Sequence, residues 1–157
     1  MPSDPAAHGP RRLPPLLRRA WYGLNQGFRQ RIAHLEVTPD HFSILRWLCE
    51  GEARGLTQRT LTDLMASDPN TITSTLTRME TAGLVSRQPH ETDRRAHRVR
   101  IEAKGRRVFE QACEIAVELQ KGVLGHLPAA RREGFLADLE CIAQACADTN
   151  LRVRRKR

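Results

Sequence analysis

Apolar residues recur at three- and four-residue intervals along most of the chain, a spacing that predicts amphipathic helices. The longest stripe runs from Leu17 through Trp21 and Phe28 to Leu35. The whole pattern predicts six helices, over about residues 15–35, 39–50, 58–66, 69–82, 103–122 and 128–148. A mainly α-helical protein is therefore expected.

Polar residues and a glycine mark the ends of the short helices. Thr38, Thr57 and Asp68 stand where an N-cap oxygen is needed, because each precedes an apolar helical stripe. Gly83 stands where helices commonly end in a left-handed residue. The third and fourth helices are separated by a tight turn around Asp68, which predicts a helix-turn-helix.

The hydrophobic period changes after Gly83. Residues 84–87 and 98–101 have the pattern of short strands, and the polar segment 88–97 joins them. A hairpin directly after the second helix of a helix-turn-helix is a wing. The predicted fold is mainly α with a small β-hairpin wing: a winged helix-turn-helix head with N- and C-terminal helices that form a dimerisation region.

The helices outside this head carry more apolar surface than one small head can cover. Pairing with a second copy of the chain would bury that surface, so a homodimer is expected. The N-terminal segment is basic and Pro-rich and lacks the apolar core of a signal peptide. The expected organisation is a disordered lead-in over 1–14, a helical dimerisation region over 15–36 and 103–148, a DNA-binding head over 38–102 and a basic tail over 149–157.

Positive charge is concentrated in three parts of the chain. The formal net charge is +8, and residues 1–35, 84–107 and 150–157 each carry a net charge of +5. Arginine-rich blocks suit the phosphates and base edges of double-stranded DNA. No apolar run reaches the roughly 18–20 residues of a membrane span, so a cytoplasmic protein without a membrane partner is expected.

The outward face of the predicted helix over 69–82 has the chemistry of a DNA-reading surface. Its side chains are short and, apart from one arginine, uncharged, which suits the base edges of a major groove. These residues are Asn70, Thr71, Thr73, Ser74, Thr77 and Arg78. A plain solvated face is the alternative, but the basic hairpin that follows favours recognition.

The hairpin carries arginines suited to a minor groove. Arg94, Arg95 and Arg98 lie in or beside its loop, and Asp93 precedes Arg95 by two residues. A carboxylate at that spacing can hold a guanidinium by a charge-assisted hydrogen bond and direct it into a narrow, electronegative groove. The alternative is a surface salt bridge worth at most about 1 kcal/mol.

From about Leu56 to Gly105 the chain resembles the MarR family of bacterial transcription regulators. The resemblance rests first on the wing motif Asp93-Arg94-Arg95 and on the alternating residues 98–101 that precede Gly105. It rests also on Met79-Glu80-x-x-Gly83-Leu84-Val85, the turn out of the recognition helix.

This resemblance implies a homodimer that binds a palindromic operator as a repressor and is released by a small aromatic or anionic ligand. By matching position it also implies that Arg95 enters the minor groove and that Asp93 orients it. One departure is Ile101-Glu102, which stands where the family usually has Leu-Thr. The start of the following helix is therefore expected to shift by about a residue.

The resemblance further implies candidates for an effector site. Some urate-responsive members use a tryptophan, an aspartate and an arginine in comparable places, and Trp21, Asp68 and the wing arginines are the candidates here. Urate is thus one candidate effector. Trp21 is equally explained as a core residue on the apolar stripe, and Asp68 as the cap of its helix.

Two other functions stay open: a thiol-based redox-sensing regulator acting through Cys49, and an architectural DNA binder without sequence specificity. An enzyme is not expected, because the chain has no Gly-rich phosphate loop, no H-E-x-x-H motif and no nucleophile elbow. The six histidines form no ligand set and the four cysteines form no C-x-x-C pair, so neither a metal nor a cofactor is expected. The cysteines are expected to be small core residues.

Overall fold

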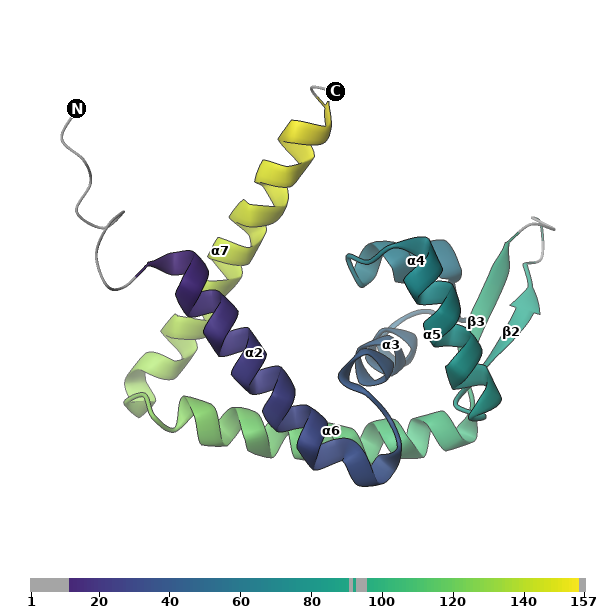
Figure 1. The fold of residues 1–157 in the computed structure, drawn as a ribbon, viewed down its shortest axis with the longest axis horizontal. Coiled ribbons are helices and arrows are strands. Elements are labelled where there is room, and N and C mark those ends of the chain that lie inside the picture. The colour runs from purple at the N-terminus through teal and green to yellow at the C-terminus, as the bar shows by residue number, and fades with distance from the viewer. Residues whose placement is uncertain (1–11, 91, 93–95, 156–157) are drawn as a thin grey trace. The chain divides into compact units, whose positions relative to one another are not determined.

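The computed structural model describes residues 12–90, 92 and 96–155, and the chain divides after Val117 into two compact units. In chain order its elements are α2 (Leu13–Ile32), the 3₁₀ turn η1 (Ala33–Leu35), α3 (Pro39–Glu50), β1 (Leu56–Thr57), α4 (Gln58–Leu64), α5 (Pro69–Thr81), β2 (Val85–Pro89), β3 (His97–Ile101), α6 (Ala103–Leu124) and α7 (Ala129–Arg155) (Figure 1). The predicted fold class, mainly α with a winged helix-turn-helix, is confirmed.

The predicted helix starts are stabilised by side-chain caps. The Thr38 hydroxyl accepts a hydrogen bond from the backbone N–H of His41 at 3.2 Å, and His41 Nδ1 accepts one from the Thr38 N–H at 3.4 Å. The pair forms a capping box with histidine in the place of the usual glutamate. Thr57 and Asp68 cap α4 and α5 as predicted.

Two helices end differently from the prediction. The first ends as α2 at Ile32 and tightens into η1, which closes at Glu36 with a left-handed φ of 56°. The last continues to Arg155 instead of ending near residue 148. The predicted left-handed end of α5 is confirmed, since Gly83 has φ 72°.

The wing belongs to a three-stranded antiparallel sheet with the order β1-β3-β2. β2 pairs with β3 from Val85↔Ile101 to Pro89↔His97, and β1 pairs on the other side of β3 at Leu56↔Val99. The sequence analysis missed β1, because a two-residue strand shows no alternation. It nevertheless joins the start of α4 to the wing.

A close backbone approach joins the sheet to α6. A Cβ atom on Gly105 would lie 2.2 Å from the Leu84 carbonyl oxygen, so only glycine fits in the first turn of α6. The same oxygen accepts a hydrogen bond from the Glu102 N–H at 3.0 Å. α6 begins directly after this bond, at Ala103.

Aromatic contacts hold three helices of the first unit together. The Phe28 ring of α2 lies edge-on to Phe42 of α3 at 4.9 Å between centroids, and Phe42 stacks on Phe109 of α6 at 5.5 Å. These rings continue into the core of the head. Its fully buried larger side chains are Ile32, Ile44, Leu45, Leu61, Ile72, Leu76, Met79, Val85 and Val99.

Several residues expected in the core are not buried in the single chain. Trp21 is 66% exposed, because only the last turns of α2, around Phe28 and Ile32, reach the core of the head. Leu64, at the last residue of α4, is 39% exposed. The cysteines, expected to be small core residues, are all free thiols and none is fully buried; these are Cys49, Cys113, Cys141 and Cys146.

The second unit consists of the end of α6 and the whole of α7. Gly125 follows α6, and α7 begins directly after Pro128, as the sequence predicted. Phe135 and Leu136 of α7 are exposed by 45% and 36%. Within the described part of the chain, no helix has the length and apolar character to cross a membrane.

Candidate nucleic-acid interface

α5 has one buried and one exposed face. Ile72, Thr75, Leu76 and Met79 are buried against the head. The side chains predicted to meet DNA are all exposed on the opposite face: Asn70, Thr71, Thr73, Ser74, Thr77 and Arg78. The structure therefore gathers these six residues on one accessible surface, which we call the α5 face.

Asp68 caps the start of this helix with both of its carboxylate oxygens. Its carboxylate accepts from the Thr71 backbone N–H at 2.9 Å and from the Thr71 hydroxyl at 2.5 Å. The side-chain bond first and the backbone bond second hold the pKa of Asp68 below its ordinary value. Its capping role is therefore sufficient to explain its position. Trp21, the other effector candidate, is 66% exposed in the single chain.

Gln58 links the two helices of the helix-turn-helix. Its side-chain amide donates to the Thr73 hydroxyl at 2.5 Å, across fifteen positions of sequence. Gln58 is the first residue of α4, so the bond ties the start of α4 to the exposed side of α5. The sequence carries no signal for this contact, because it depends on the angle between the helices.

An ion pair ties α5 to the wing. Arg87 Nη2 and Nε lie 2.7 and 2.9 Å from Glu80 Oε2, and the Arg87 backbone N–H donates to Glu80 Oε1 at 3.0 Å. The hydrogen bonds from the Arg87 side chain are the main cause that keeps the pKa of Glu80 below its ordinary value. Arg87 Nη2 also donates to the Thr77 hydroxyl at 3.2 Å. We call this the Glu80–Arg87 clamp.

Neither partner of the clamp was predicted from the sequence to make this contact. Glu80 stood in the quoted family motif, but its partner Arg87 was considered only as a strand residue. A signal existed: a glutamate at the end of a helix and an arginine just after the connecting turn are close enough to pair. The clamp fixes the direction in which the wing leaves α5.

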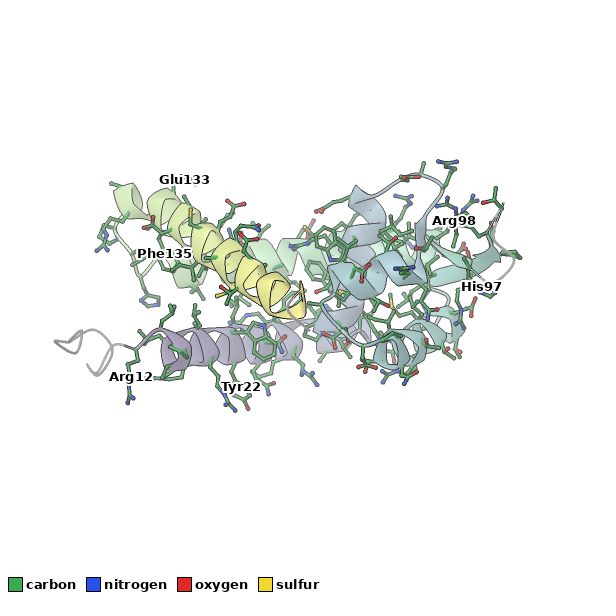
Figure 2. All side chains as sticks on the ribbon, turned by 90° about the horizontal axis from the view of Figure 1, so that it is seen from above. Arg12, Tyr22, His97, Arg98, Glu133 and Phe135 are labelled. Carbon is green, nitrogen blue, oxygen red and sulfur yellow. The ribbon has the colours of Figure 1, made fainter. Side chains whose placement is uncertain are left out.

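The predicted wing residues are only partly described. Asp93, Arg94 and Arg95 lie outside the described residues; on either side of them the His90 N–H donates to the Ala96 carbonyl at 3.0 Å. Arg98 lies on β3, and its Nη1 donates to the Gly55 carbonyl at 3.1 Å. Figure 2 shows Arg98 and its neighbour His97 beside the hairpin. Arg98 thus braces the turn before β1 in this structure, and its contact with DNA stays a prediction.

A hollow of about 730 Å³ lies between α4, the start of α5 and the loop end of the β2–β3 hairpin. Its lining includes one arginine and one aspartate, so it carries charges of both signs. The lining residues are Thr57, Gln58, Arg59, Thr62, Asp63, Pro69, His90, Ala96 and His97. Among the residues that the structure describes, no group of three His, Cys, Asp or Glu side chains could hold a metal ion.

Comparisons with known proteins agree with this geometry. The sequence model of the MarR family matches residues 37–97. The transcriptional regulator HosA of Escherichia coli is 29% identical over 126 residues, which cover 77% of this chain and 92% of HosA.

Solved structures show the same fold over most of the chain. A MarR family protein from Bacillus stearothermophilus is 30% identical, with a TM-score of 0.70 over 84% of this chain and 91% of its own. The transcriptional repressor CouR, bound to a 23-mer DNA duplex, is 26% identical, with a TM-score of 0.75 over 82% and 89% of the two chains. CouR from Rhodococcus jostii RHA1 bound to p-coumaroyl-CoA is 24% identical, with a TM-score of 0.71 over 82% and 89%.

Proposed function

Because this chain belongs to the MarR family of transcription regulators, we propose that it binds a palindromic DNA operator as a homodimer and represses transcription until a small aromatic or anionic ligand releases it. Family membership makes it a transcription regulator and not an enzyme, as the sequence predicted. The observation that carries the DNA-binding proposal is the α5 face, which is exposed, polar and attached to a basic wing through the Glu80–Arg87 clamp.

The α5 face suits a major groove for three reasons. Its side chains are short, so the helix backbone can come close to the bases. Its one arginine, Arg78, carries N–H donors, and phosphates and guanine edges accept hydrogen bonds from such donors. On the opposite face Leu76 and Met79 are buried in the head, and this packing holds α5 in place while its polar side chains stay exposed. The wing then places Arg94, Arg95 and Asp93 at an adjacent minor groove, as the resemblance implies.

The proposal that the protein is released by a ligand rests on its relatives. CouR has been solved both on DNA and with p-coumaroyl-CoA, an aromatic thioester that carries phosphates. Urate remains a specific candidate, with Trp21 and Asp68 as the residues to test. A thermal-shift screen with urate, xanthine and salicylate-like acids, followed by competition against bound DNA, would identify the effector.

The redox alternative is less well supported. Burial is the main cause that raises the pKa of the Cys49 thiol above its ordinary value, and the charge of Arg106 opposes this only in part. A thiol that stays protonated reacts slowly with peroxide. DNA binding that is unchanged after peroxide treatment is therefore the expected result.

The architectural alternative is tested by sequence preference. A duplex selected by the protein from a library with a randomised centre is compared with a scrambled duplex of the same composition at about 200 mM salt. A specific regulator should prefer the selected duplex by at least about a thousandfold. Equal affinity for the two duplexes would support a non-specific architectural binder and contradict our proposal.

A further inference from the structure

The threonine hydroxyls of the α5 face are already committed to hydrogen bonds within the protein. The Thr73 hydroxyl donates its only proton to the Pro69 carbonyl at 2.7 Å, and the Thr77 hydroxyl donates to the Thr73 carbonyl at 2.9 Å. The Thr71 hydroxyl donates to Asp68, as described above. A hydroxyl has one proton to donate, so these three side chains have no donor left for a base.

Two of these hydroxyls are also engaged as acceptors. Gln58 Nε2 donates to the Thr73 oxygen at 2.5 Å, and Arg87 Nη2 donates to the Thr77 oxygen at 3.2 Å. Both side chains remain exposed. Thr73 and Thr77 therefore have no donor and at most one acceptor lone pair left for a ligand, while their γ-methyl groups take part in none of these hydrogen bonds.

Two neighbours on the same helix differ in this respect. The Asn70 amide and the Ser74 hydroxyl are both exposed, and neither has a hydrogen-bond partner among the described residues. They keep both donors and acceptors for the edges of bases. Four of the six residues of the α5 face thus form two kinds: Thr73 and Thr77, whose hydroxyls hold their methyl groups in place, and Asn70 and Ser74, whose polar groups have no partner among the described residues.

We propose that α5 recognises thymine through the methyl groups of Thr73 and Thr77, while Asn70 and Ser74 form its hydrogen bonds to bases; this proposal rests on the proposed function. Thymine is the only standard base with a methyl group in the major groove, and apolar contact from a threonine methyl is a known way of reading it. Thr73 and Thr77 are one helical turn apart, a rise of about 6 Å, which spans about two base-pair steps. The operator half-site should therefore contain thymines within about two steps of each other.

The test removes single methyl groups from the DNA. Each thymine of the selected duplex is replaced in turn by deoxyuridine, which lacks only the C5 methyl group, and the Kd of the wild-type protein is measured. At one or two positions the Kd should rise roughly fourfold, the effect of one buried methyl group. Thr73→Ser and Thr77→Ser, which keep the hydroxyl, should each make one of these positions insensitive to the replacement.

Two matched variants serve as controls. Thr77→Val keeps the methyl group and loses the hydroxyl, so it should keep the sensitivity to deoxyuridine. Ser74→Ala should weaken binding to the thymine and deoxyuridine duplexes by the same factor, because it removes a hydrogen bond and no methyl contact.

Three results would overturn the methyl proposal while leaving specific DNA binding intact. These are a selected half-site without thymine, a wild-type Kd that no deoxyuridine replacement changes, and serine variants as sensitive to the replacement as the wild type. If the protein selects no duplex at all, the proposed function itself fails.

Discussion

Ser86 of β2 carries a buried hydroxyl that has no hydrogen-bond partner among the described residues. A buried hydroxyl that loses water and gains no partner destabilises the folded state. The contacts that position this strand come from its neighbours, because Val85 packs in the core and Arg87 bonds to Glu80. No contact in the part of the chain that the structure describes requires a hydroxyl at position 86.

Ser86→Ala should accordingly raise the free energy of unfolding by about 1 kcal/mol. Denaturant unfolding followed by circular dichroism would measure it. Thr75→Val is the matched control, because the buried Thr75 hydroxyl accepts from Arg78 Nη2 at 3.5 Å and its removal should bring no gain. Loss of stability in Ser86→Ala would show that this hydroxyl is satisfied in solution.

Arg95→Ala should weaken binding to the selected duplex by about 1–3 kcal/mol and leave the unfolding transition unchanged. The reason is the minor-groove role that the family resemblance gives to this arginine. Arg131→Ala, an exposed arginine of α7, is the control for the loss of one positive charge. If both variants bind equally well, Arg95 has no specific role.

At the level of single residues, the sequence predicted which side chains of α5 face outward, because helical periodicity determines exposure. It could not predict how they are engaged. The bonds of Thr73 to Gln58 and of Thr77 to Arg87 depend on the angles between α4, α5 and β2. Those angles are set by packing and leave no periodic trace.

At the scale of elements, the Glu80–Arg87 clamp joins the last turn of α5 to the first strand of the wing. The carboxylate of Glu80 is only partly shielded, with 37% of its side chain exposed. Solvent therefore screens the pair, and its main effect is to orient the wing. The sequence predicted both elements but not the third strand, β1, whose two residues are too few for a pattern.

The clamp predicts a pH dependence of stability. The pKa of Glu80 in the folded protein is below the ordinary 4.5, so the ionised carboxylate stabilises the fold at pH values above 4.5. This contribution is lost as the pH falls through the lower, folded-state value. The stability difference between the wild type and Glu80→Gln should therefore be largest near neutral pH and shrink towards about pH 3. A constant difference over that range would contradict the assignment.

His41 gives a second pH-dependent contribution, at the start of α3. Burial is the main cause that lowers its pKa below 6.5, the charge of Arg78 adds to this, and Asp40 opposes it. The unfolded chain therefore binds a proton at a higher pH than the folded one, so stability falls as the pH drops below about 6.5. His41→Gln keeps a capping-box side chain and should reduce this loss. His34→Gln, at an exposed histidine, should not.

At the scale of the whole molecule, the chain exposes large apolar side chains on each unit. On α2, Leu13, Leu16, Trp21 and Leu24 are between 45% and 66% exposed. Trp21 continues the stripe whose far end, at Phe28 and Ile32, is buried in the head. The sequence predicted this stripe correctly but could not show where one chain stops covering it.

A second copy of the chain is proposed to bury these exposed apolar side chains. Sedimentation at micromolar concentration should give about twice the chain mass of 17.8 kDa. Trp21→Glu should raise the dimer dissociation constant at least about tenfold, because it places a charge where the proposed dimer would bury an aromatic ring. Gln30→Glu, on the opposite side of α2, is the control and should leave the dimer intact. A monomeric wild type would contradict the proposed homodimer.

The contact at Gly105 has a mechanical consequence. No side chain separates the first turn of α6 from Leu84, whose carbonyl oxygen also accepts from the Glu102 N–H. Leu84 follows Gly83, the residue that ends α5. A shift of this end of α6 must therefore move the end of α5 with it, since there is no flexible side chain to absorb the displacement. An effector that moves α6 would therefore also displace α5, the helix that we propose contacts DNA.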